Sequence, residues 1–197
     1  METFSIHFEK ETEIPYSGPE LRPHFLLQKF GIKGTGMAAF MGPCRVETAS
    51  LVDWEDRLES DRIEAKKMLH FLGEFFQVDL RAAVTFQHLL IANLMDILVQ
   101  NESLPGTWTR EGNDLYWSSS DSSVERKKLS VSIVTASPVS TLLHLGINLD
   151  PFGAPVSAVG LEELGINAQR VGQELLERAK TEWERIAWSC VKVRPVF

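Results

Sequence analysis

The order of strand-like and helix-like segments most limits the folds that this chain can adopt. Apolar and polar residues alternate over 3–8, which predicts a half-buried strand. Helical spacing of apolar residues follows over 61–76 and 79–97, strand patterns return over 107–149, and a long helix is predicted over 167–188. Strands and helices are thus grouped, which argues against a doubly wound parallel sheet, in which they alternate. We expect an α+β fold with a mixed or antiparallel sheet flanked by helices.

The two predicted middle helices each combine an N-cap residue with an apolar stripe. Ser60 and Asp61 can cap the first helix, and Asp79 can cap the second. The apolar set that predicts the first helix is Ala65, Met68, Leu69, Leu72, Phe75 and Phe76. Two short strands are expected within 37–46, and residues 191–193 can add a last strand.

Length and composition fit one soluble globular domain over residues 1–197. Hydrophobic residues make up 44% and charged residues 24%, close to the average for such proteins. The net charge of −7 argues against a general nucleic-acid-binding protein, because such proteins are normally basic. No apolar stretch approaches the roughly 20 residues that cross a bilayer, and the N-terminus lacks the apolar core of a signal peptide. Because the two cysteines are also too few for a disulfide framework, we expect a cytoplasmic protein without membrane contact.

Several common enzyme motifs are missing from the sequence. It has no Gly-x-x-x-x-Gly-Lys-Ser/Thr loop for nucleotide phosphates and no Gly-x-Gly-x-x-Gly between a strand and a helix. It also lacks paired Cys-x-x-Cys motifs for zinc and the Gly-x-Ser-x-Gly of an ordinary serine hydrolase. The function must therefore be sought in less common combinations of residues.

Two adjacent strand patterns carry the strongest local feature. Residues 127–134 begin with two lysines, and residues 142–150 contain His144, Gly146 and Asn148. A lysine at the mouth of a strand can pair with a carboxylate or phosphate, and a glycine within a strand lets a ligand approach closely. The asparagine can donate and accept hydrogen bonds together. The alternative is that the lysines are solvated residues after a loop and that the glycine marks a β-bulge.

These segments resemble the core strands of biotin protein ligases, lipoate–protein ligases and octanoyltransferases. In those families a lysine opens a central strand and a Gly-Ile-Asn segment lies beside it, as Lys128 and residues 146–148 do here. Residues 16–21 are similar to a Gly-Pro-containing loop of the octanoyltransferases, and residues 110–116 stand where those enzymes have a substrate-contacting strand. Over 14–170 the chain resembles an uncharacterised prokaryotic family with the same ligase-like fold, which is related to class II synthetase cores.

The resemblance implies that Lys128 contacts the acyl carbonyl and, in a ligase, the phosphate of an adenylate. Its positive charge would stabilise charge that develops at the reacting centre. The resemblance also makes His144 and Asn148 candidate catalytic neighbours of that centre. The residues that it implies for substrate binding are Tyr16, Gly18, Arg110, Asp114 and Gly146.

The chain departs from these families at two points. Octanoyltransferases use a cysteine downstream of the asparagine strand as the acyl acceptor, and residues 155–161 contain none. Cys190 is expected in the core, and Cys44 follows a Gly-Pro turn where it could be exposed. Biotin ligases carry a Gly- and Arg-rich loop over the nucleotide, whereas residues 31–36 have glycines and a lysine but no arginine.

Carboxylates suggest two further sites. Asp53, Glu55 and Asp56 could bind Mg²⁺, which the activation of a carboxylate by ATP would need; the alternative is a solvated acidic turn. On the first predicted middle helix, His70 and Glu74 have i,i+4 spacing and could form a metal-ligand or acid–base pair. The alternative for this pair is an ordinary surface contact.

The sequence therefore supports more than one function. The first hypothesis is a protein that binds a small carboxylate or acyl donor, as a ligase or acyltransferase in which Lys128 positions the acyl group; Mg²⁺ and ATP would be its cofactors. The alternative is a non-catalytic small-molecule-binding or regulatory domain that kept the fold and lost the chemistry. A third hypothesis is a subunit or homo-oligomer whose tryptophans form an interface.

Overall fold

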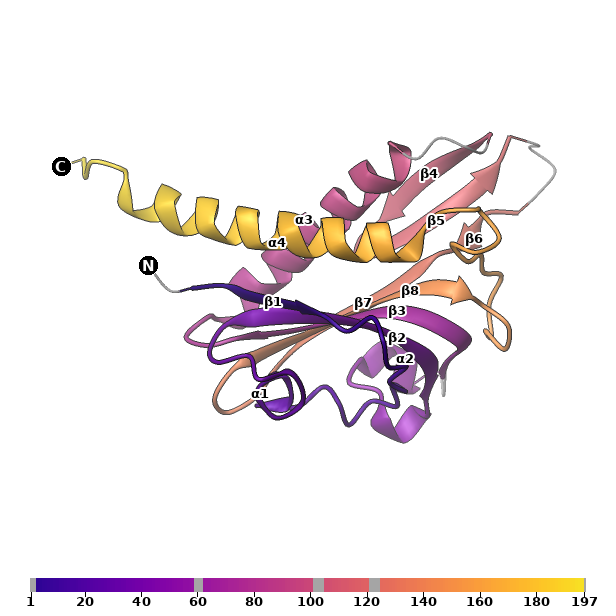
Figure 1. The fold of residues 1–197 in the computed structure, drawn as a ribbon, viewed down its shortest axis with the longest axis horizontal. Helices are drawn as coiled ribbons and strands as arrows, with labels where there is room; N and C mark the ends of the chain where they lie inside the picture. The colour runs from indigo at the N-terminus through magenta and orange to yellow at the C-terminus, as the bar shows by residue number, and fades with distance from the viewer. Residues whose placement is uncertain (1–2, 59–61, 101–104, 121–124, 197) are drawn as a thin grey trace.

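A computed structural model describes residues 3–58, 62–100, 105–120 and 125–196. Its centre is a five-stranded sheet with strand order β1-β2-β3-β8-β7, in which β1 and β2 are parallel and the other neighbours are antiparallel. A three-stranded sheet with order β4-β5-β6 lies beside it (Figure 1). The strands are β1 (Ser5–Phe8), β2 (Gly36–Val46), β3 (Ile63–Phe75), β4 (Gly106–Glu111), β5 (Asp114–Ser119), β6 (Lys127–Lys128), β7 (Ser130–Ala136) and β8 (Thr141–Asp150). The expected α+β class with a mixed sheet is confirmed.

Two long helices cover one face of the central sheet. They are α3 (Leu80–Val99) and α4 (Ala168–Val191), and Figure 1 shows them on the side of the sheet away from the short helices. Asp79 caps α3 by accepting a hydrogen bond from the Ala82 amide at 2.7 Å, and Asn167 caps α4. The apolar stripe of α3 packs mainly on β7 and β8 and that of α4 mainly on β1 and β2, and with the sheet residues beneath them they form the larger part of the core.

Short elements cover the opposite face of the sheet. These are α1 (Phe25–Phe30), the 3₁₀ turn η1 (Thr48–Ser50) and α2 (Trp54–Leu58). With the N-terminal segment they form a smaller apolar cluster that includes Tyr16 and Phe40. Because this cover is incomplete near β7, the sheet face there remains open to a cavity.

The predicted helix over 61–76 is wrong, because Ile63–Phe75 is the central strand β3. Its two faces are both buried, since α3 and α4 cover one side and the short elements cover the other. A strand buried on both faces has a nearly continuous apolar run, whose spacing also satisfies a helical pattern. His70 and Glu74 are therefore on the same face of a strand and about 13 Å apart, too far to form a pair.

Smaller differences concern other strands. Residues 36–46 form one long strand, and its pairing with β3 is irregular between Gly42 and Cys44. No strand is present at 191–193, because α4 continues to Val191 and the described residues after it are irregular.

Helix α3 is long and apolar enough to cross a membrane by length and composition alone, and it is the one such helix among the described residues. This corrects the expectation that no apolar stretch approaches that length. Of its most apolar window, 44% is buried inside the protein, where Phe86, Leu90 and Leu94 belong to the core. A core helix meets the same criterion, so this is weak evidence for a membrane span.

Candidate functional site

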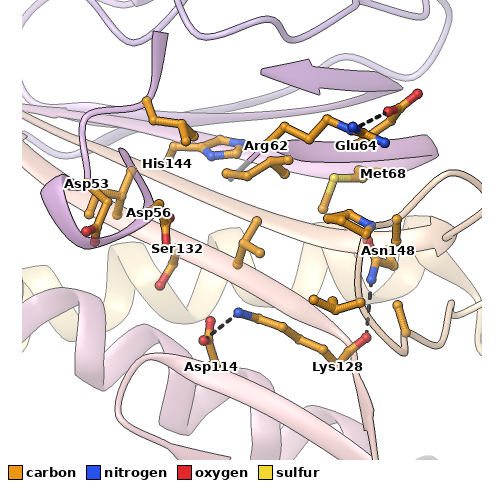
Figure 2. A pocket seen from close by; sticks show the side chains of 18 of the residues that line it. Asp53, Asp56, Arg62, Glu64, Met68, Asp114, Lys128, Ser132, His144 and Asn148 are labelled. Carbon is orange, nitrogen blue, oxygen red and sulfur yellow. Dashed lines mark hydrogen bonds and ion pairs between the residues drawn. The ribbon is translucent and has the colours of Figure 1, made fainter. Parts of the chain in front are cut away.

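A cavity of about 280 Å³ lies on the face of the central sheet opposite α3 and α4 (Figure 2). Its floor is formed by β3, β7 and β8, and its walls come from the start of β5, from β6, from residues 51–56 and from residues 154–158. The volume is near the lower end of the range for small-molecule pockets. Polar lining residues from five segments are Asp53, Glu55, Asp56, Arg62, Glu64, Asn113, Asp114, Lys128, Ser132, His144 and Asn148.

Lys128 occupies one wall, and its backbone amide and carbonyl are both hydrogen-bonded to residues 157–159. Its amide donates to the carbonyl of Ser157 at 2.9 Å, and its own carbonyl accepts from the amide of Val159 at 3.0 Å. Its ammonium forms an ion pair with Asp114 at 2.7 Å, and both side chains are about three-quarters buried. Burial raises the pKa of Asp114, while the neighbouring ammonium works in the opposite direction. The site thus presents a positioned cation whose charge is balanced by one carboxylate.

Asn148 connects the Lys128 wall to the floor. Its side-chain amide donates to the carbonyl oxygen of Lys128 at 3.3 Å. Its backbone accepts from Leu161 and donates to Leu129, both at 2.9 Å. These contacts hold the backbone of Lys128 and Leu129 in place at the edge of the cavity.

Two buried imidazoles lie in contact beneath the cavity. Nδ1 of His70 is 3.1 Å from Nε2 of His144, and Nε2 of His70 is 3.3 Å from the carbonyl oxygen of Gly42. Burial lowers the pKa of His70 to about 3 and that of His144 well below its ordinary value. Both rings are therefore neutral near pH 7. His144 lines the cavity, whereas His70 lies behind it.

Tyr16 and Phe40 hold the two imidazoles by stacking. The Tyr16 ring lies 3.9 Å from the His144 ring, centre to centre, at an interplanar angle of 11°. Phe40 stacks on His70 at 5.1 Å. The loop that contains Tyr16 therefore supports His144 from behind and does not line the cavity with Lys128.

The carboxylates of α2 and the residues before it form an acidic wall. Asp53, Glu55 and Asp56 line the cavity, and Glu64 does so while paired with Arg62 at 3.1 Å. Within the described part of the chain, no three His, Cys, Asp or Glu side chains converge to hold a metal ion. A divalent cation at this wall would need additional ligands from a bound molecule, such as nucleotide phosphates.

Two further candidates for substrate binding have other surroundings. Gly18 has φ +106° in a tight turn packed against Ser50, which favours glycine there. Arg110 is exposed and contacts the carbonyl of Gly112 and, at 2.6 Å, Nδ1 of His88, so it lies outside the cavity lining.

Glu74 and Gly146 both stabilise the arrangement of the sheet face. Glu74 is buried and accepts hydrogen bonds from the backbone amide of His24 and from the hydroxyl of Ser140. Gly146 lies between His144 and Asn148 on β8 and is not itself among the residues that line the cavity. A Cβ there would be 2.7 Å from Cε of Met68, so the glycine makes room for the Met68 side chain, which does line the cavity.

Sequence reasoning missed several residues that line the cavity. Met68 and Arg62 were missed because their segment was assigned to a helix, and the apolar run of β3 is buried on both faces, so its own residues do not show the alternation of a strand. Asn113 and Ser132 come from a turn and a strand whose packing against each other has no local sequence signal.

The chain belongs to a family described as Domain of unknown function (DUF366), whose model matches residues 5–194. An uncharacterised protein of Methanocaldococcus jannaschii, MJ0805, is 32% identical over 203 residues, which cover 100% of this chain and 87% of that protein. A protein of unknown function from Pyrococcus horikoshi is similar in structure, with a TM-score of 0.89 and 34% identity over 99% of this chain and 100% of that one. The relatives named here are archaeal, which suggests a prokaryotic origin.

Solved ligases share the fold at low identity. A mutant biotin protein ligase from Aquifex aeolicus, in complex with biotin, has a TM-score of 0.54 and 16% identity; the match covers 91% of this chain and 70% of that one. The LipL1 protein of P. falciparum, in complex with lipoate, has a TM-score of 0.52 and 11% identity, covering 100% and 65%. These likenesses establish the biotin/lipoate-ligase fold for this chain, and they do not establish its activity.

Proposed function

We propose that the cavity binds a small carboxylic acid or its activated acyl form, with the acyl oxygen at the Lys128 ammonium, and that it carries out ligase or acyl-transfer chemistry. The observation that carries this proposal is the placement of Lys128. Its backbone amide and carbonyl are both hydrogen-bonded to residues 157–159, and its side chain projects into a cavity of ligand size.

The chemistry of the pair with Asp114 supports this role. A lysine ammonium has three donors, and Asp114 engages it through one oxygen at 2.7 Å. An acyl or carboxylate oxygen can take another donor without breaking that pair. In the partly buried site the cation would polarise a carbonyl and stabilise negative charge on its oxygen.

The acyl acceptor in this proposal comes from another molecule. Cys44 is buried outside the cavity lining, and burial raises the pKa of its thiol to about 12, which makes it a poor nucleophile. Cys190 is exposed near the end of α4, far along the chain from the site. The expected exposure of the two cysteines was therefore reversed. A thioester on this chain is not part of the proposal.

ATP and Mg²⁺ enter the proposal through the acidic wall. Asp53, Glu55 and Asp56 line the same cavity as Lys128. A nucleotide that brings Mg²⁺ on its phosphates would place a divalent cation against these carboxylates. Adenylation of the acid is the reaction that this arrangement favours.

A second candidate function is binding without catalysis, in a small-molecule sensor or regulatory domain. It is favoured by Ser132, the one hydroxyl-bearing residue among the described residues that line the cavity. That hydroxyl accepts from Gln87 at 2.9 Å and donates to the carbonyl of Asn113 at 3.1 Å, so it is already engaged. A cytoplasmic location, a homo-oligomeric state and the lack of nucleic-acid or membrane partners belong to either proposal. Cell fractionation, size-exclusion chromatography and pull-down of the tagged protein would test them.

The test is ATP–pyrophosphate exchange with Mg²⁺ and a panel of acids that includes octanoate, biotin, lipoate and amino acids. Lys128→Met removes the ammonium and keeps most of the side-chain length. Lys127→Met is the matched control, because Lys127 is the neighbouring residue, pairs with Glu163 at 3.0 Å and does not line the cavity. Thermal stabilisation by the same acids is measured in parallel.

We expect exchange that depends on one acid, persists in Lys127→Met and disappears in Lys128→Met. Acid-dependent stabilisation that requires Lys128 but comes without exchange would support the binding-only function. Exchange or stabilisation that is equal in both variants would overturn the role of Lys128. The absence of both signals with every acid would overturn the proposal of an acyl site.

A further inference from the structure

Three groups form a hydrogen-bonded chain that runs from the sheet to the cavity. The carbonyl of Gly42, the ring of His70 and the ring of His144 are joined by contacts of 3.3 Å and 3.1 Å. They belong to the adjacent strands β2, β3 and β8. Since His144 lines the cavity, the chain ends at a ring that a ligand can reach.

The Gly42 carbonyl sets the direction of both hydrogen bonds. A carbonyl oxygen can only accept, so Nε2 of His70 carries a proton. Burial holds the pKa of His70 at about 3, so the ring is neutral near pH 7 and its Nδ1 has a lone pair. That lone pair must accept the Nε2–H of His144.

The free lone pair of His144 is therefore on Nδ1. No described residue donates a hydrogen bond to this nitrogen, although His144 as a whole is only 2% exposed. Beside the ring, Gly146 makes room for the side chain of Met68, since a Cβ there would be 3.3 Å from Cε1 of His144 and 2.7 Å from Cε of Met68. In Figure 2, His144 and the Lys128 ammonium lie on opposite sides of the cavity. The site thus combines a cation on one side with an unused acceptor on the other.

The charged residues that line the cavity also favour a hydrogen-bond donor on the ligand. Both cations in the lining have a carboxylate partner: Lys128 pairs with Asp114 and Arg62 with Glu64. The lining also contains Asp53, Glu55 and Asp56, so among the described residues five carboxylates line the cavity with two cations. Their field favours hydrogen-bond donors and positive charge over a second anionic group.

We propose that the ligand of this cavity carries an N–H or O–H donor remote from its acyl end, and that Nδ1 of His144 accepts a hydrogen bond from that donor. This inference rests on the proposed function, because it assumes that the acyl end lies at Lys128. His144 is then a specificity-determining residue. His70 is a positioning residue that fixes the tautomer of His144 through Gly42.

The first test needs no ligand. Two-bond ¹H–¹⁵N correlation spectra of the ¹⁵N-labelled protein at pH 7 distinguish the tautomers of each histidine. We expect His70 and His144 both to be neutral with the proton on Nε2. A proton on Nδ1 of His144, or a charged imidazolium at either position, would overturn the inference whether or not an acid binds.

The second test compares acids that differ only at the remote end. Titration calorimetry uses octanoate, 8-hydroxyoctanoate and 8-aminooctanoate with the wild-type protein and with His144→Phe, which keeps a ring against Tyr16. His88→Phe is the control, because His88 is a histidine outside the cavity lining. We expect the donor-bearing acids to bind about three- to tenfold more tightly than octanoate, the effect of one hydrogen bond. This preference should vanish in His144→Phe and persist in His88→Phe.

The outcomes separate this inference from the function on which it rests. Octanoate binding that requires Lys128, with no preference for the donor-bearing acids, overturns the role of His144 and leaves the acyl site standing. A preference that persists in His144→Phe also overturns that role. Failure of all three acids to bind, with the expected tautomers observed, overturns the acyl site while the direction of the imidazole chain stands.

Discussion

Acidification from pH 7 to pH 5 should destabilise this protein through its two buried imidazoles. In the unfolded chain a histidine titrates near pH 6.5, whereas burial keeps the pKa of His70 at about 3 in the folded protein and lowers that of His144 strongly. Between these values the unfolded state binds more protons than the folded state. Stability is therefore fully present above about pH 6.5 and is lost as the pH falls towards the folded pKa.

The size of this loss of stability depends on how far the pH lies below the pKa of histidine in the unfolded chain. At pH 5 the unfolded state gains about 2 kcal/mol from protonation of one such histidine, relative to pH 7. Two coupled rings give about 2–4 kcal/mol, a large part of the stability of an ordinary domain. Carboxylates contribute little in this range, because they titrate mainly below pH 5.

Urea unfolding at pH 7, 6 and 5 measures this loss as a difference in free energy of unfolding. The double variant His70→Gln, His144→Gln should have lower stability throughout but a much flatter dependence on pH. His88→Gln, at a partly exposed histidine, should keep the wild-type slope. A wild-type stability that changes by less than about 0.5 kcal/mol, or an unchanged slope in the double variant, would refute the reasoning.

Three other substitutions test separate parts of the account. Gly146→Ala should weaken acid binding measured by calorimetry while the protein remains folded, because the new Cβ meets the flexible end of Met68 at 2.7 Å; affinity equal to wild type would show that the floor is not used. Asn148→Ala should cost about 1 kcal/mol in urea unfolding and reduce acid affinity, since it removes one of the two hydrogen bonds to the carbonyl of Lys128; loss of stability alone would limit Asn148 to a structural role. Trp183→Ala should cost about 3 kcal/mol or more, because its ring packs on Phe4, Phe75 and Phe86; a change below about 1 kcal/mol would contradict that packing.

The sequence predicted well the elements that carry a local signal, such as an N-cap residue at the start of a helix. Helices α3 and α4 begin after Asp79 and Asn167, whose side chains accept hydrogen bonds from the first turn. Strand β8 was predicted at 142–149 and spans Thr141–Asp150. In these segments local chemistry and tertiary packing favour the same structure.

The central strand β3 could not be assigned from its own residues. Its apolar run is buried on both sides, and only the pairing with β2 and β8 distinguishes it from a helix. That single error separated His70 from His144, because the register that brings these strands together has no local signal. The wrong assignment of β3 did not affect the prediction of Lys128 and Asn148, since both lie in segments whose strand patterns were recognised.

The loop around Tyr16 illustrates a second limit. Its sequence suggested a substrate-contacting loop, whereas in the fold it pairs with Cys44 and Arg45 and stacks on His144. Whether a loop faces a cavity or the back of a catalytic candidate depends on long-range packing. Sequence similarity of a short Gly-Pro motif does not contain that information.

The central claim is that a small acid binds at Lys128, and its most direct test is to map where the acid binds. Backbone and side-chain amide resonances are followed by NMR while octanoate or a donor-bearing analogue is added. We predict shifts concentrated at Lys128, Asp114, Asn148 and Ala158, which surround the proposed acyl end, and their loss in Lys128→Met. Shifts concentrated instead at residues 43–45, 65–66 and 152–153, which form another surface hollow and do not line the candidate cavity, would contradict the claim.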